Sequence, residues 1–172
     1  MSKYKIVALV IGLVIGATGA ILLAPNTQTA GFTDEYNFKS FQGGVAVPYL
    51  NISATTATLG EDVLGGVVTF NNASGTTATL PPAKAGGVIT FVTGTAPDTN
   101  NNVIDSAEGD NIEGLLEVNA ADVACSGEDQ IDMASTTATV GDFVKLASDG
   151  SSWYIVGSAI DTAAGATCTD PS

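Results

Sequence analysis

Residues 143–156 read FVKLASDGSSWYIV, and this stretch decides the fold. Two apolar segments, 143–147 and 153–156, flank a short polar segment that contains Asp149 and Gly150. Asp-Gly is a preferred dipeptide of tight hairpin turns, which require positive φ angles. The pattern therefore predicts a β-hairpin with strands at 142–148 and 152–158.

The same strand pattern extends over most of the chain. The sequence is rich in Val and Thr, which favour strands, and in Gly, Asn and Asp, which favour turns. Further strands are expected at 52–59, 66–71, 76–80, 87–93, 103–105, 111–118, 130–133 and 136–140. The expected fold is all-β, with an antiparallel, jelly-roll-like β-sandwich at residues 51–160 and a C-terminal tail at 161–172.

A short sequence recurs within the predicted sandwich. Segments 53–62 (SATTATLGED), 76–81 (TTATLP) and 135–142 (STTATVGD) resemble one another. Their spacing is irregular, which argues against the fixed period of a solenoid. We interpret them as similar strand–turn units reused in one sandwich.

Residues 6–24 (IVALVIGLVIGATGAILLA) form an uncharged apolar run behind a basic N-terminus at residues 1–5. A helix of this length spans roughly 28 Å, close to the thickness of a bilayer core. Because Lys3 and Lys5 precede the run and every acidic residue follows it, the rest of the chain is expected on the non-cytoplasmic side. The alternative is a cleaved secretory signal, which also combines a basic start with an apolar segment.

Two features near the N-terminus predict association. Gly12 and Gly16 form a GxxxG motif that favours helix pairing in lipid, although small residues are also common in such segments. Residues 25–50 form a connector and an aromatic-rich arm. Aromatic side chains here, and at the predicted hairpin, are expected to contact a neighbouring subunit or to pack on their own domain, and those of the arm could also lie near the lipid headgroups. These candidates are Phe32, Tyr36, Phe38, Phe41, Trp153 and Tyr154.

Composition excludes several function classes. The chain has a formal net charge of −13 at pH 7 and contains neither His nor Arg. Such a surface repels phosphate backbones, so nucleic acid is not an expected partner. The usual acid–base and phosphate-handling side chains are missing, and the carboxylates are dispersed. We therefore expect a protein that is not an enzyme.

Two sites are predicted from individual residues. Cys125 and Cys168 make an even count in the exported part, which predicts one disulfide, the alternative being two free thiols. The turn-rich segment 98–109 carries oxygen ligands that could surround a calcium ion, the alternative being a solvated loop. The candidate ligands are Asp98, Asn100, Asn102 and Asp105, and no other cofactor is expected.

Three motifs carry a resemblance to a known family. They are TLPPAKAGGVITFV at 79–92, GDNIEG at 109–114 and GDFVKLASDGSSWYIVG at 141–157. Residues 52–160 resemble a small β domain that recurs in phage virion proteins, especially those of marine phages. The resemblance implies a fibre, spike or surface decoration, often trimeric. The N-terminal apolar segment departs from that pattern, and it points to a virion with an internal membrane or to a host-encoded exported protein.

The leading hypothesis is a non-enzymatic structural virion protein, held in membrane lipid by residues 6–24. Its acidic β domain would contact other virion proteins or a host surface, as a homo-oligomer with a trimer favoured, at the virion membrane or surface or in the extracellular space. The first alternative is a secreted bacterial or archaeal filament or matrix subunit. In it, residues 1–30 are cleaved and residues 31–50 donate a strand to the next subunit. The second alternative is a carbohydrate-binding adhesin domain.

Overall fold

The computed structural model describes residues 40–41, 44–45 and 47–170 of the chain. The predicted helix at 6–24, with Gly12 and Gly16, lies outside the described residues, as do Phe32, Tyr36 and Phe38. Within the described ranges, no helix has the length and apolar character needed to cross a membrane.

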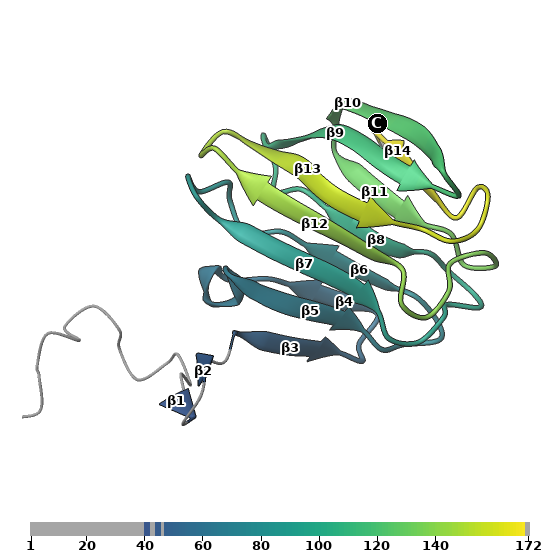
Figure 1. The fold of residues 1–172 in the computed structure, drawn as a ribbon, viewed down its shortest axis with the longest axis horizontal. Helices are drawn as coiled ribbons and strands as arrows, with labels where there is room; N and C mark the ends of the chain where they lie inside the picture. The colour runs from purple at the N-terminus through teal and green to yellow at the C-terminus, as the bar shows by residue number, and fades with distance from the viewer. Residues whose placement is uncertain (1–39, 42–43, 46, 171–172) are drawn as a thin grey trace, which may run out of the picture. The chain divides into compact units, whose positions relative to one another are not determined.

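The described strands form three sheets (Figure 1). A two-stranded sheet pairs β1 (Ser40–Phe41) with β2 (Gly44–Val45). The seven-stranded sheet has the order β10-β9-β13-β12-β7-β5-β3, and the five-stranded sheet has the order β14-β11-β8-β6-β4. The strands of the seven-stranded sheet are β3 (Tyr49–Ile52), β5 (Gly66–Phe70), β7 (Val88–Thr93), β9 (Asn111–Val118), β10 (Ala121–Glu128), β12 (Phe143–Ser148) and β13 (Ser152–Ala159). Those of the five-stranded sheet are β4 (Thr56–Thr58), β6 (Thr76–Thr79), β8 (Asn102–Asp105), β11 (Gln130–Met133) and β14 (Ala166–Thr169).

The two larger sheets pack face to face around one apolar core. Burial alternates along β5, β6, β7, β8 and β11, because successive side chains of a strand point to opposite faces. Phe70 and Phe91 stack with ring centroids 5.7 Å apart on neighbouring strands. Ile104, Ile131 and Met133 contribute to the same core from the five-stranded sheet. Figure 1 shows this sheet behind the seven-stranded one.

The first half of the domain winds between the two sheets. Strands β3, β5 and β7 pair in parallel in one sheet, and β4, β6 and β8 pair in parallel in the other. Because these strands alternate along the chain, each turn of the chain adds one strand to each sheet. A short 3-10 helix, η2 (Glu61–Val63), lies in the connection from β4 to β5.

The second half adds hairpins and closes one end of the stack. β12 pairs antiparallel with both β7 and β13, and β9 pairs antiparallel with β10. The turn between β9 and β10 consists of Asn119 and Ala120, with φ angles of 50° and 59°. Positive φ at both central residues is the geometry of a tight hairpin turn. β10 and β14 are then the edge strands of the two sheets at the same end of the domain.

The structure confirms an all-β, sandwich-like domain and corrects its details. The sheets are mixed, so the expectation of wholly antiparallel pairing is wrong, and the jelly-roll connectivity, which consists of antiparallel pairs, is not confirmed. The predicted strand at 52–59 is not continuous: β3 ends at Ile52, and β4 (Thr56–Thr58) belongs to the other sheet. Residues 136–140 form no strand, because Thr137 and Ala138 turn back to the carbonyl of Ala134. The predicted tail at 161–172 contains β14, which pairs with β11.

Candidate functional site: the outer face of the five-stranded sheet

The outer face of the five-stranded sheet carries two regular rows of side chains. Registers between neighbouring strands place one residue of each strand in each row, and these residues alternate with the buried core positions. The first row consists of Thr56, Thr77, Val103, Asp132 and Thr167. The second row consists of Thr58, Thr79, Asp105, Gln130 and Thr169. This outer face is therefore rich in hydroxyl groups and carries two carboxylates.

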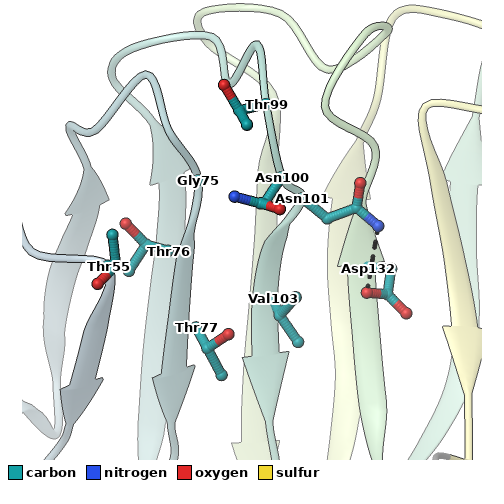
Figure 2. A pocket seen from close by; sticks show the side chains of 9 residues that line it. All are labelled: Thr55, Gly75, Thr76, Thr77, Thr99, Asn100, Asn101, Val103 and Asp132. Carbon is teal, nitrogen blue, oxygen red and sulfur yellow. Dashed lines mark hydrogen bonds between the residues drawn. The ribbon is translucent and has the colours of Figure 1, made fainter.

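A shallow hollow of about 510 Å³ lies over the first row. Figure 2 shows its lining, with Thr77 and Val103 from two neighbouring strands, Asp132 on one side, and the loop that carries Thr99, Asn100 and Asn101 above them. The remaining lining residues are Thr55, Gly75 and Thr76. Gly75 is required where it stands: its φ angle is 84°, and a Cβ atom built on it would lie 2.6 Å from the carbonyl carbon of Asn100.

Hydrogen bonds hold the two carboxylates of this face in place. Asp132 accepts from the Thr169 hydroxyl at 2.7 Å and from the Asn101 amide at 3.4 Å. Asp105 accepts from the Gln130 amide at 2.7 Å and from the Thr79 hydroxyl at 3.2 Å. Both carboxylates therefore connect neighbouring strands of the sheet. The hollow holds hydroxyl and amide groups and one carboxylate, a set suited to hydrogen bonding with a neutral polar ligand.

The four calcium candidates do not share one face of the sheet. Asn102 and Asp105 lie three positions apart on β8, so their side chains point to opposite faces of the sheet. Asn102 is fully buried toward the core, whereas Asp105 lies on the outer face. Asn100 donates to the carbonyl of Ser74 at 2.9 Å, and Asp98 accepts from the hydroxyl of Thr99 at 2.8 Å. In the described part of the chain, no three acidic, His or Cys side chains form a metal-binding group.

The predicted disulfide is confirmed. Cys125 on β10 and Cys168 on β14 are bonded, with their Cα atoms 5.4 Å apart and a sequence separation of 43. Since β10 and β14 are edge strands of different sheets, the bond connects the two layers of the sandwich at one end.

The aromatic candidates at the hairpin have different environments. Trp153 is completely buried, so its ring belongs to the core and offers no contact surface. Tyr154 is 40 % exposed and remains available for contact. Phe41 is the second residue of β1, whereas Phe32, Tyr36 and Phe38 lie outside the described residues.

A local hydrogen-bond network orders the turn of this hairpin. The Asp149 carboxylate accepts from the backbone N–H groups of Ser151 and Ser152 at 2.8 and 3.0 Å and from the Tyr154 hydroxyl at 3.0 Å. These bonds, the one from Ser151 first, hold the pKa of Asp149 below its ordinary value. The hydrogen bond to Asp149 and its negative charge raise the pKa of Tyr154.

Of the residues that line the hollow, only Asn100 was a predicted site residue, as a calcium candidate. Thr77 and Asp132 become neighbours of the same hollow only through the parallel register of β6 with β8 and the antiparallel register of β8 with β11. The sequence did contain one signal for this face, the repeated tripeptide Thr-Ala-Thr at 56–58 and 77–79. In the structure, these two copies lie side by side on neighbouring strands. Models of known protein families do not match the chain, and a search of curated proteins finds no match either.

Proposed function

We propose that this chain is a non-enzymatic structural protein of a virus particle. Residues 6–24 would hold it in a membrane, and the acidic sandwich would project on the non-cytoplasmic side, in contact with other virion proteins. The sequence resemblance of residues 52–160 to phage virion β domains supports this proposal. That resemblance also favours homo-oligomers, with a trimer first among them.

The disulfide between the edge strands β10 and β14 is the observation that carries the proposal. Disulfides persist in oxidising surroundings such as virion surfaces and extracellular spaces. This one joins the two sheets, so it stabilises a rigid module. A structural protein of a particle requires a rigid, stable domain of this kind, whereas an enzyme requires reactive side chains that converge on one site.

The described carboxylates support the same assignment through the structural bonds they make. Asp142 is buried, and it accepts from the backbone N–H groups of Thr139 and Asp161 at 2.7 and 3.1 Å. Asp110 accepts from the backbone N–H of Ala83 at 2.6 Å. These groups fasten loops to the sandwich, as expected of a structural domain.

Purified particles provide the test. Antibodies raised against residues 47–170 should label the particle surface, and mass spectrometry of the same particles should find a chain that begins at Met1 or Ser2. A mature chain that begins near Ile21 or Gly31 would overturn the membrane anchor and favour the secreted filament subunit. Absence of the chain from particles, together with its presence in the host's secreted matrix, would overturn the virion role.

The hollow of the outer face favours a second candidate, a carbohydrate-binding domain. Its hydroxyl groups, amides and single carboxylate resemble the hydrogen-bonding partners that sugar hydroxyls require. Trp153 is buried and cannot stack on a sugar ring, which leaves Tyr154 as the exposed aromatic residue of the hairpin and weakens this candidate. A glycan array with the full chain decides the question: binding that Asp132→Ala abolishes would support it, and no binding to any sugar would exclude it.

A further inference from the structure

The end of the sandwich opposite the disulfide is open. Among the described residues, no strand pairs with the outer edge of β3 or of β4, the last strands of the two sheets. Hydrogen bonds from Val67 to the Pro48 carbonyl and from Asn71 to the Ile52 carbonyl fix the ladder between β3 and β5. In a regular parallel ladder, the backbone N–H and C=O of Tyr49 and Asn51 then point away from β5. They form an unpaired edge.

Within the described residues, this edge carries neither the charges nor the bulges that protect many edge strands from pairing. Protected edges carry charges, bulges or a covering element. β10, at the closed end, carries Asp122 and Glu128 and has a bulge at Gly127. β3 and β4 carry no charge and no bulge. The apolar side chains beside the open edge are well exposed, Val47 by 57 % and Tyr49 by 66 %.

The acidic residues are concentrated away from the open end of the domain, and this distribution favours contact between copies at the open end. Residues 47–170 contain sixteen Asp and Glu residues, and fourteen of them follow residue 97. The five strands from β3 to β7 contain no charged residue, whereas β8, β9, β10 and β11 all contain acidic residues. A chain with a net charge of −13 repels its own copies, and repulsion is weakest where the carboxylates are fewest.

We propose that the open edge of β3 and β4 joins two copies of this chain in a two-fold contact. In this contact, β3 pairs antiparallel with β3 of the second copy, and β4 pairs antiparallel with β4 of the second copy. One two-fold axis, perpendicular to the stacked sheets, relates both pairs. Such an isologous contact closes after two copies and continues both sheets across the interface. It also places the two acidic ends as far apart as possible, which minimises their repulsion.

Cross-linking of the full chain in its membrane or particle tests this contact. The native cysteines are bonded to each other, so a short bis-maleimide reacts with an introduced thiol alone. Asn51→Cys and Thr58→Cys, at the edges of β3 and β4, should each give covalent dimers. Ser126→Cys, exposed on β10 at the opposite end, is the matched control and should give none. Equal cross-linking at Ser126→Cys, or none at either open-edge position, would overturn the proposal.

A backbone substitution tests whether edge pairing makes the contact. Asn51→Pro removes an outward N–H and should lower the cross-linking yield of Thr58→Cys by about tenfold, because proline cannot donate to a ladder. Asn51→Ala keeps the N–H and should leave the yield unchanged. If the proline variant does not fold, Tyr49→Asp provides the second test, since it places like charges opposite each other across the axis. Tyr49→Ser is its matched control.

The remaining outcomes distinguish other occupants of the edge. Slow hydrogen exchange at the Tyr49 and Asn51 amides in a monomeric chain would show that residues of the same chain cover the edge, which overturns the two-fold contact. If the chain forms a trimer and Asn51→Pro leaves that trimer intact, the two-fold contact is overturned. The threefold association in the proposed function would be unaffected by this result. Disruption by Asn51→Pro and Tyr49→Asp, and by neither control, would establish it.

Discussion

Gly66, the first residue of β5, lies directly against Pro48, the residue that precedes β3. A Cβ atom built on Gly66 would lie 2.7 Å from the Cβ of Pro48 and nearer still to the Pro48 carbonyl oxygen. That carbonyl accepts the first hydrogen bond of the ladder, from Val67 at 2.8 Å. We expect Gly66→Ala to lower the free energy of unfolding by about 1–3 kcal/mol, the usual effect of overpacking a buried site. Denaturant unfolding of the full chain with its disulfide intact measures it.

Gly157 on β13 provides the matched control. A Cβ atom built there would meet nothing within 4 Å. Gly157→Ala should therefore leave stability unchanged or raise it by a few tenths of a kcal/mol, because alanine reduces the freedom of the unfolded chain. If both variants destabilise equally, the close approach of Pro48 to Gly66 is not the reason for the glycine.

Asp149 provides a prediction of pH dependence at a single residue. Its folded pKa lies below its unfolded value because the N–H groups of Ser151 and Ser152 and the Tyr154 hydroxyl stabilise the carboxylate. A depressed pKa contributes stability above the unfolded pKa, and this contribution is lost as pH falls through the folded pKa. Acidification should therefore weaken the hairpin turn progressively as the pH falls from the ordinary pKa of an aspartate to the lower folded pKa.

Carbon-detected NMR titration of the Asp149 carboxyl measures this effect directly. We expect a midpoint below the ordinary value, and Tyr154→Phe should move it part of the way back, because one of the three donors is removed. In the wild type, the raised pKa of Tyr154 should shift its absorbance titration to higher pH. Normal midpoints for both groups would show that the network does not persist in solution.

At the scale of elements, the disulfide joins two edge strands, each of which is hydrogen-bonded to a neighbouring strand on one side only. β14 pairs on one side only, with β11, and β10 on one side only, with β9. The bond closes a loop of 43 residues, for which the chain-entropy account gives about 4 kcal/mol of stabilisation. Reduction should lower the free energy of unfolding by that amount and accelerate hydrogen exchange in β14 before other strands.

The control for this prediction is a chain that cannot form the bond. The double variant Cys125→Ser with Cys168→Ser should be as unstable as the reduced wild type and should not respond to reductant. If the reductant destabilises the double variant equally, its effect does not arise from the disulfide. Unchanged exchange in β14 would contradict the connection between edge strands.

The elements that sequence reasoning found are those with strong local signals. The β12–β13 hairpin has an Asp-Gly turn between two apolar runs, and both strands lie within a residue or two of the prediction. The β9–β10 hairpin was missed, because Asn119 and Ala120 form a positive-φ turn without glycine and β10 is exposed and polar. Local patterns cannot show such a turn when neither the dipeptide nor the alternation is typical.

The short repeat at 53–62, 76–81 and 135–142 shows that strand register, and not local sequence alone, determines the role of a segment. Two of its copies stack in parallel, with Thr56 beside Thr77 and Thr58 beside Thr79, in successive turns of the chain between the sheets. The third copy has the same letters but forms the turn before β12. The hydroxyl-rich outer face therefore depends on strand pairing between distant segments, which composition and spacing do not determine. The same holds for the calcium candidates, which do not share one face of the sheet.

At the scale of the whole molecule, we expect cations to stabilise the acidic half by screening its charge and not by binding at a specific site. Raising NaCl from 0.01 to 0.15 M shortens the Debye length from about 30 to about 8 Å, so the melting temperature should rise by a few degrees. Calcium and magnesium at equal ionic strength should raise it equally, because two of the calcium candidates, Asn102 and Asp105, point to opposite faces of the sheet. A saturable shift with calcium alone would restore the predicted calcium loop.

The acidic end also contains a pair of like charges that a single substitution can relieve. Glu117 on β9 and Asp122 on β10 are direct cross-strand partners, and both are exposed. Like charges in such positions are destabilising, and opposite charges contribute roughly 0.2–1 kcal/mol. Asp122→Lys should therefore raise the free energy of unfolding, with Asp122→Asn giving a smaller gain. Because salt screens exposed pairs, the advantage of lysine over asparagine should shrink in 1 M NaCl. An advantage that persists at high salt would show that β-propensity or packing, and not charge, sets the stability of this edge.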